Sequence, residues 1–243
     1  MRDNKSKKHS RALRIRVRWD VLRRPFPAQE DYYDSHWHDW EGRIKDGHNA
    51  EEKRIKILCE KWRKRSSPDD YLDDDLASEY IRTCDLTNNM YAALIVSIWS
   101  EMERFLKRLI PPCSSQKNFD FFQFKKLIKR ELSISVDRCK EHSTINAIRH
   151  LNNLFKHEHG YCDPQKGPYK EIEKSKLAKR SLPDRRKRGT RFVAQKIEID
   201  YSKLSISGLI EACNSFCSDL ILKVEKKTRN KENHKQERNG VRS

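Results

Sequence analysis

This sequence has few hydrophobic residues and no long apolar run. Hydrophobic side chains make up 35% of its 243 residues, whereas charged side chains make up 37%. The longest apolar stretch, from Met90 to Trp99, is far shorter than the roughly 20 residues that cross a bilayer as a helix. The basic, polar start lacks the apolar region of a secretory signal. We therefore expect no membrane contact, in a chain long enough for one large domain or two small ones.

The sequence also lacks a paired cysteine framework. Its seven cysteines are odd in number and scattered along the chain. Disulfides form and persist in oxidising compartments, whereas free thiols are typical of the cytoplasm. The cysteine usage therefore indicates a cytoplasmic protein with free thiols.

What the sequence has in excess is positive charge, and this charge is concentrated in three segments. Residues 1–24 carry a net charge of +8, residues 164–191 of +8 and residues 223–243 of +5, whereas the rest of the chain carries −4 of the total +17. A nearly neutral core with basic attachments is the pattern of a protein with a polyanionic partner, most commonly nucleic acid. Basic segments that only increase solubility are the alternative.

The second of these segments leads to a specific expectation. We expect residues 164–191 to be a flexible basic insert, in which the run Arg185, Arg186, Lys187 and Arg188 contacts RNA. Residues 227–243 are expected to be a disordered basic tail.

The apolar periodicity predicts a mainly α-helical fold. Residues 50–64, 86–110, 119–132 and 205–226 each place apolar side chains at helical spacing. Residues 13–19 and 197–201 instead alternate with a period of two, which predicts two strands that pair in a small sheet. Residues 1–49 are expected to form a basic and aromatic N-terminal extension, irregular from residue 25 to residue 47.

The stretch STINAIRHLNNLFKHEHG, residues 143–160, predicts one helix with two different faces. Its apolar residues fall on one side, whereas Arg149, Asn153 and His157 recur every fourth residue on the other. Lys156 and His150 flank this row, which we call the polar stripe. Ser143 or Thr144 is a suitable N-cap for the helix, and Gly160 suits the left-handed residue that ends it.

Such a stripe can hold a phosphate and move protons. RNA cleavage without a metal begins with attack of a 2′-hydroxyl on the adjacent phosphate, which requires a proton-transfer group and a cation. A histidine has an ordinary pKa near 6.5 and suits the first role, so we assign it to His157. Arg149 suits the phosphate because it stays charged and offers a fork of donors. Asn153 would orient the scissile group, and Lys156 would add a second cation.

A functionless solvated helix face is the alternative to this assignment. Such a face normally mixes Glu with Lys. The stripe is instead rich in Asn and His, with no carboxylate between Glu141 and Glu158.

The order of these segments resembles the HEPN superfamily of prokaryotic defence and toxin proteins, over roughly residues 50–226. The matching pieces are the long helix YAALIVSIWSEMERFLKRLI, a middle helix, a helix ending NNLFKH, a loop with a strand, and a closing helix. The resemblance implies a HEPN-like helical bundle that acts as a metal-independent endoribonuclease without a cofactor. It also implies a homodimer across which the site is completed, in a system where an antitoxin or a sensor subunit restrains the toxin.

The resemblance assigns roles to individual residues. His157 matches the catalytic His of the family and Asn153 its polar residue, whereas Asn152 fills the usual Arg position. The nearest arginine, Arg149, is separated from His157 by seven residues, one more than the family's usual maximum. The family often carries an acid on the long helix, which Glu103 matches best. The helical wheel instead favours Glu101 as the inward-facing acid and as a partner for Arg149.

Two alternative functions compete with the ribonuclease. The first is a non-catalytic HEPN-like module that binds RNA or scaffolds a defence complex, in which Asn152 records the loss of the active arginine. The second is a zinc-stabilised nucleic-acid binder, because Cys139, His142, His159 and Cys162 have ligand-like spacings. These four residues meet only if the helix between them breaks near His142, so we expect no metal site.

Overall fold

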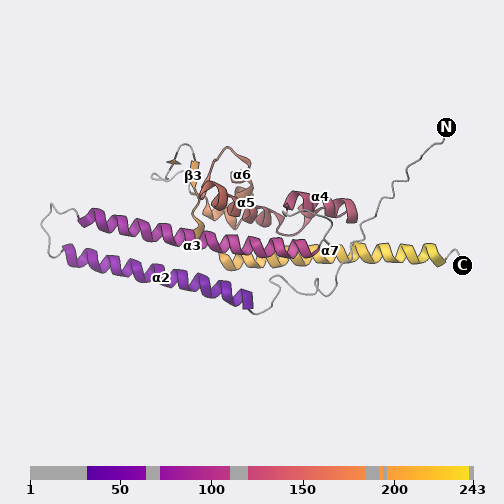
Figure 1. Cartoon of the computed structure of the whole chain (residues 1–243), viewed down its shortest axis with the longest axis horizontal. Helices are drawn as coiled ribbons and strands as arrows, with labels where there is room; N and C mark the ends of the chain where they lie inside the picture. The colour runs from indigo at the N-terminus through magenta and orange to yellow at the C-terminus, as the bar shows by residue number, and fades with distance from the viewer. Residues whose placement is uncertain (1–31, 64–71, 110–119, 184–191, 194–195, 241–243) are drawn as a thin grey trace, which may run out of the picture.

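A computed structural model describes residues 32–63, 72–109, 120–183, 192–193 and 196–240, and within them the side chains of 39–61, 76–109, 120–183 and 196–229. Over these ranges the fold is mainly α-helical with a small antiparallel sheet, as the sequence predicts (Figure 1). The main helices are α2 (Tyr32–Arg63), α3 (Leu72–Leu109), α4 (Phe121–Leu132), α5 (His142–Glu158), α6 (Gly167–Lys174) and α7 (Ile206–Gly240). The strands are β1 (Tyr161–Cys162), β2 (Phe192–Val193) and β3 (Lys196–Glu198), and single 3-10 turns, η1 (Val136–Arg138), η2 (Ala178–Ser181) and η3 (Tyr201–Lys203), lie between them.

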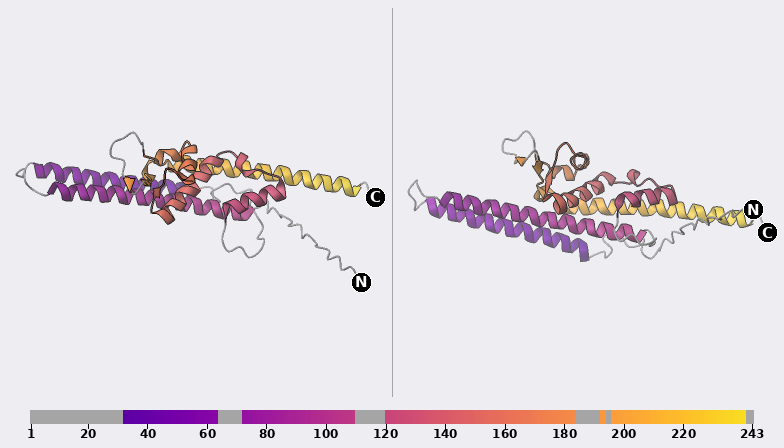
Figure 2. Two further views of the ribbon diagram at one scale, coloured as in Figure 1. Left: turned by 90° about the horizontal axis from the view of Figure 1, so that it is seen from above. Right: turned by 45° about the horizontal axis from the view of Figure 1, so that its top comes forward.

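A long helical hairpin of α2 and α3 supports the rest of the molecule (Figures 1 and 2). The apolar stripe expected on the long helix is buried along its whole length, at Tyr91, Leu94, Ile95, Ile98, Met102, Phe105 and Leu109. Helix α3 starts at Leu72, 14 residues before the expected start at Leu86. The intervening residues are acidic, and carboxylates are favourable near the positive end of a helix dipole. The acidic run therefore forms the first turns of α3, which continues without a break into the apolar stretch.

Helix α5 lies on α3 and is held there by α6 and α7 (Figure 1). Its apolar residues Ile145, Ile148 and Leu151 are at most 1% exposed. The helix ends at Glu158, one residue earlier than expected, and its left-handed C-cap residue is His159 at φ +52°. Gly160, the residue expected there, follows at φ +83° and donates its N–H to the Leu154 carbonyl at 3.0 Å. The expected N-cap is wrong, because the helix begins at His142, after Glu141 in the left-handed region.

The small sheet has the strand order β1-β3-β2, with both pairs antiparallel. Tyr161 lies opposite Glu198, so the sheet begins directly after the end of α5. The predicted strand at residues 197–201 is confirmed in part, as β3. Its expected partner at residues 13–19 lies outside the described residues.

Three segments differ from the expectation drawn from the sequence. Residues 32–47, expected to be irregular, belong to α2, so the expected domain boundary at residue 50 falls inside a helix. Residues 167–181, expected to be flexible, form α6 and η2, because Tyr169, Ile172 and Ala178 are buried in the core. The tail expected to be disordered from residue 227 continues α7 to Gly240.

One side chain ties the hairpin to the segment after β3. The Asn88 amide donates to the Ile199 carbonyl at 3.0 Å and accepts from the Tyr201 N–H at 2.6 Å. The Tyr201 hydroxyl in turn donates to the Leu151 carbonyl at 3.0 Å. Helix α5 is therefore positioned on α3 by a chain of hydrogen bonds as well as by apolar contact.

We predict that Asn88→Ala lowers the free energy of unfolding by about 1–3 kcal/mol, because it leaves two backbone groups without partners. Its neighbour Asn89 is exposed, so Asn89→Ala is the matched control and should change stability by less than about 0.5 kcal/mol. Urea unfolding followed by circular dichroism measures both. Equal losses in the two variants would contradict the role given to Asn88.

Candidate functional site on helix α5

The polar stripe is partly exposed, as the sequence predicts. Asn153, Lys156 and His157 are exposed, whereas Ile148 and Leu151 on the opposite side of the same helix are buried. A helix anchored along one face holds the side chains of its other face at fixed positions. The C-terminal half of the stripe is therefore an accessible row of an amide, an ammonium and an imidazole.

Arg149, at the other end of the stripe, is only half exposed and is held against neighbouring side chains. Its Nη2 donates to the Nε2 atom of His150 at 2.9 Å, and its Cζ lies 5.9 Å from the centre of the Phe121 ring of α4. Its Nε is buried and has no hydrogen-bond partner. Burial lowers the pKa of Arg149, although a guanidinium keeps its charge at neutral pH.

His150 is a neutral acceptor for Arg149. Burial first, and then the charge of Arg149, lower the pKa of His150 to about 4. At neutral pH its ring therefore carries one proton, and Nε2 can accept the hydrogen bond from the guanidinium. His150 thus supports Arg149 and is not suited to proton transfer near pH 7.

The acids expected beside Arg149 lie elsewhere. Glu101 pairs with Arg104 on its own helix, and Glu103 accepts from Trp99 Nε1 at 2.6 Å. Glu101 is the more buried of the two, with 14% of its side chain exposed against 32% for Glu103. The expected partnership of Glu101 with Arg149 is wrong. The carboxylates that stabilise the charge of Arg149, and so oppose the lowering of its pKa by burial, are Asp120 and Glu171.

Asn152, to which the HEPN resemblance would give the arginine position, does not belong to the exposed row. It is 3% exposed, its Nδ2 donates to Asn153 Oδ1 at 3.0 Å, and its own Oδ1 is buried without a partner. A long cationic side chain at this position would have to leave the core to reach solvent. The residue in the stripe that can hold a phosphate is therefore Arg149 and not residue 152.

Arg149 and His157 do not converge within one copy of the chain. His157 lies eight positions after Arg149 along the helix, a rise of about 12 Å. Arg149 is also turned towards Phe121 and His150. One copy therefore presents the cation and the imidazole to different points of a bound polyanion.

The structure adds basic residues near His157 that sequence reasoning missed. Lys196 of β3 forms an ion pair with Glu158 at 2.6 Å. Lys196, and to a smaller extent Lys166 and His157, lower the pKa of Glu158. The pairing of β1 with β3 brings this lysine next to the end of α5. Residues 197–201 were recognisable as a strand, but their partner was not, so this neighbourhood was not predictable. The run Arg185, Arg186, Lys187 and Arg188 lies outside the described residues, and its contact with RNA stays a prediction.

The zinc alternative is wrong. Cys139 precedes α5, and His142 is its first residue. His159 and Cys162 follow the end of this helix, which is continuous. Burial also raises the pKa values of Cys139 and Cys162 to about 11, which disfavours the thiolate form that binds zinc. Over the residues whose side chains are described, no group of three or more His, Cys, Asp or Glu side chains is arranged to hold a metal ion.

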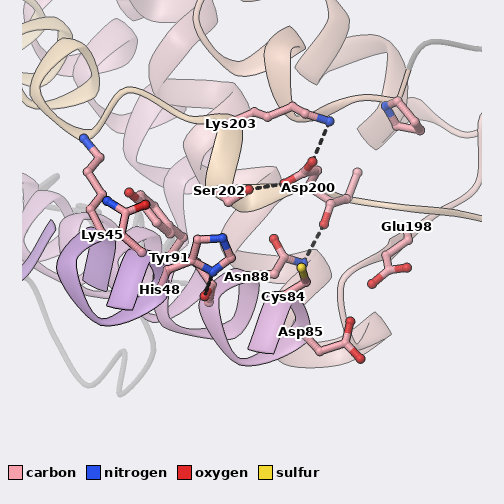
Figure 3. A pocket seen from close by; sticks show the side chains of 14 residues that line it. Lys45, His48, Cys84, Asp85, Asn88, Tyr91, Glu198, Asp200, Ser202 and Lys203 are labelled. Atoms are coloured by element: carbon pink, nitrogen blue, oxygen red, sulfur yellow. Dashed lines mark hydrogen bonds and ion pairs between the residues drawn. The ribbon is translucent and has the colours of Figure 1, made fainter. Parts of the chain in front are cut away.

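A cavity of about 610 Å³ lies away from the stripe, between the hairpin and the segment after β3 (Figure 3). Figure 3 shows several of its polar groups bonded to one another. His48 Nδ1 lies 2.9 Å from Thr87 Oγ1, and Asp200 pairs with Lys203 at 2.5 Å. Asn88, which also lines the cavity, donates a hydrogen bond to the Ile199 carbonyl. These contacts stabilise the junction between elements, so the stripe remains the candidate site.

Comparison of the chain with protein-family models, with curated proteins and with solved structures found no match. None of the helices in the described ranges has the length and apolar character that crossing a membrane requires.

The neutral state of His150 predicts a pH dependence of stability. Its pKa is about 4 in the folded protein against 6.5 ordinarily, so the unfolded chain binds this proton more readily. Its contribution to stability is therefore complete above pH 6.5 and is lost as the pH falls from 6.5 to about 4. His150→Gln keeps an acceptor for Arg149 but does not titrate. Urea unfolding across this window should show a shallower loss of stability in the variant than in the wild type, and identical slopes would contradict the assignment.

Proposed function

We propose that this protein is a HEPN-like, metal-independent endoribonuclease of a defence or toxin-antitoxin system, with its RNA site on α5. The observation that carries the proposal is the exposed row Asn153, Lys156 and His157 on a helix whose opposite face is buried. The basic residues Lys166 and Lys196 near its end would extend the contact to neighbouring phosphates. The net charge of +17 supports a polyanionic substrate.

The spacing of the stripe suits two copies that meet around one RNA strand. Arg149 and His157 lie four residues on either side of Asn153. Two α5 helices that cross antiparallel at Asn153 would place Arg149 of a second copy opposite His157. Such a two-fold pairing would bring an Arg149 guanidinium close to His157, whereas within one copy the two residues lie about 12 Å apart along the helix. Two stripes of like charge repel each other, so we expect this pairing only with RNA between them.

The reaction follows from the chemistry of these groups. A 2′-oxygen attacks the adjacent phosphorus, the bond from phosphorus to the 5′-oxygen breaks, and the products are a 2′,3′-cyclic phosphate and a 5′-hydroxyl. His157 would transfer a proton at the attacking or leaving oxygen, and Arg149 of the second copy would stabilise the charge on the phosphate. Asn153 would orient the phosphate, and Lys156 would hold a neighbouring one.

A specific observation favours the non-catalytic alternative, an RNA-binding or scaffold module. Asn152 is buried, and Arg149 is engaged by His150 and Phe121. A protein that retained only Lys156 and the nearby lysines for phosphate contacts would bind RNA without cleaving it. The two functions share the same surface and differ in the role of His157.

We predict that His157→Ala lowers RNA cleavage in EDTA by at least about 100-fold, which is the range expected for losing a proton-transfer group. His157 is exposed, so circular dichroism and thermal melting should be unchanged. The matched control is His159→Asn, at an exposed left-handed position that asparagine tolerates, and it should cleave as the wild type does. Undiminished cleavage by His157→Ala would show that the assigned site is wrong.

Binding is tested separately in the His157→Ala background, where the RNA stays intact. Adding Lys156→Ala should weaken binding of single-stranded RNA and lower the slope of log K against log salt by about 0.7, the contribution of one phosphate contact. Adding Lys140→Ala, an exposed lysine before α5, is the matched control and should leave the slope unchanged. Fluorescence anisotropy over a salt series measures both. Equal slopes in the two variants would remove Lys156 from the RNA surface.

A further inference from the structure

Helix α4 carries an exposed aromatic ring beside a lysine. Phe121 and Phe124 of this helix are at most 3% exposed and belong to the core, whereas Phe122 is 51% exposed. Lys126, one turn further along, places its Nζ 4.2 Å from the centre of the Phe122 ring. A single exposed aromatic residue needs no explanation by itself. The charges around this ring therefore decide whether it has the character of a binding site.

Helix α4 is basic, but two of its cations are already paired within the chain. It has four Lys or Arg residues against one Glu over 12 residues. Lys125 forms an ion pair with Asp137 at 2.7 Å. Arg130 forms one with Glu131, also at 2.7 Å. The charges of Lys125 and Arg130 are therefore largely balanced by neighbouring carboxylates.

The other two cations lie on the same side of α4 as Phe122. Lys126 follows Phe122 by four positions, and Lys129 follows Lys126 by three, so the three side chains are neighbours on the helix surface. Lys126 and Lys129 are both exposed. Among the side chains that the structure describes, no carboxylate forms an ion pair with either lysine. We call Phe122, Lys126 and Lys129 the α4 face.

An aromatic ring flanked by unpaired lysines has the chemistry of a site for single-stranded nucleic acid. The face of a base stacks on an aromatic ring whatever the base, and lysines hold the phosphates. The Lys126 ammonium lies over one face of the Phe122 ring, so a base would stack on the other. The bases of a duplex already stack on one another, so the ring favours an unpaired strand.

The α4 face lies next to the arginine of the polar stripe. Helices α4 and α5 are neighbours on one side of α3 (Figure 1). The ring centre of Phe121, the residue before Phe122, lies 5.9 Å from Arg149 Cζ and 6.3 Å from the centre of the His142 ring of α5. A strand with a phosphate at Arg149 can therefore continue over α4.

We propose that the α4 face is a second RNA subsite, where an unpaired base stacks on Phe122 and the adjoining phosphates contact Lys126 and Lys129. The identity of the polyanion rests on the proposed function, but the subsite does not depend on cleavage by His157. The substrate is accordingly single-stranded RNA. Stacking involves no hydrogen bonds to the base edges, so the subsite tolerates any sequence.

The first test measures stacking. Full-length protein in the His157→Ala background is titrated onto an unstructured RNA oligonucleotide in EDTA, with fluorescence anisotropy as the readout. Phe122→Ala should weaken binding at least about fivefold, the loss of one stacked base. Phe122→Leu, which keeps an apolar side chain but no ring, should weaken it similarly. Phe122→Tyr restores the ring and should bind within about twofold of the parent.

Tyr80→Ala is the matched control for loss of an exposed ring. Tyr80 is 42% exposed on α3. It lies about 28 Å along this helix from Trp99, whose ring contacts Phe121 of α4. Tyr80→Ala should therefore bind RNA as its parent does. Equal binding by Phe122→Ala and its parent, or weak binding by Phe122→Tyr, would overturn stacking on this ring.

The second test separates stacking from charge with the same oligonucleotide after removal of every base. Phe122→Ala and its parent should bind this strand within about twofold of each other, because no base is left to stack. Lys126→Ala should lower the slope of log K against log salt by about 0.7 on both strands. Lys53→Ala, at an exposed lysine of α2, should leave the slope unchanged. Equal losses by Phe122→Ala on both strands would overturn the proposal.

Cleavage by the wild type is a separate readout, so the two proposals fail separately. Cleavage with unchanged RNA binding in Phe122→Ala and Lys126→Ala would overturn the α4 subsite and leave the function on α5 standing. Absence of cleavage, with weaker binding in both variants, would support the subsite and contradict the ribonuclease. Absence of RNA binding would overturn the subsite as well.

Discussion

Burial of the apolar face of α5 against α3, α6 and α7 is the constraint on which the rest of the structure depends. It is complete at Ile145, Ile148 and Leu151. Because the helix cannot rotate without exposing these side chains, its polar residues are fixed on the opposite side. The hydrogen bonds from Asn88 to the segment after β3, and from Tyr201 to α5, add a polar tie to the same junction. The candidate site is thus a consequence of core packing.

The two ends of the stripe differ in their surroundings, and this difference shapes the proposed function. Arg149 is half-buried against Phe121 and His150, within the influence of the Asp120 and Glu171 carboxylates, and its buried Nε has no hydrogen-bond partner. His157 is exposed and precedes Glu158, on which lysines from two other segments act. The first environment favours a firmly held phosphate, and the second leaves the imidazole accessible to a bound RNA. A site built from both ends requires two copies of α5 around the RNA.

The sequence predicted the helices well where one face is buried and the pattern is long. We could predict the apolar stripe of α3 from Tyr91 to Leu109, the two faces of α5 and the glycine just after that helix. Each of these features depends on local periodicity or on one backbone angle. Residues 167–181 were wrongly predicted to be flexible because they contain many lysines and only a few side chains that are buried, namely Tyr169, Ile172 and Ala178. The amino-acid composition of such a segment reflects its many exposed residues. It does not reveal the few buried side chains that hold the segment in the core.

Contacts between distant segments were not predictable in the same way. The strand predicted at residues 197–201 was recognisable in part, as β3. The strands that pair with it come from distant parts of the chain, so its own sequence does not identify them. The half-buried position of Arg149 likewise depends on Phe121 of α4, which no spacing within α5 reveals.

The most direct test of the central claim is a substrate test in EDTA. Wild-type protein is incubated with an RNA oligonucleotide that it cuts, and with the same oligonucleotide carrying a single 2′-deoxy nucleotide at the cut. The account predicts cleavage of the first to a 2′,3′-cyclic phosphate and a 5′-hydroxyl, and no cleavage at the modified position. Cleavage at the 2′-deoxy position, or products that end in a 5′-phosphate, would contradict attack by the 2′-hydroxyl at the α5 site. Tight binding without cleavage of either oligonucleotide would contradict the enzyme and identify the surface as an RNA-binding module.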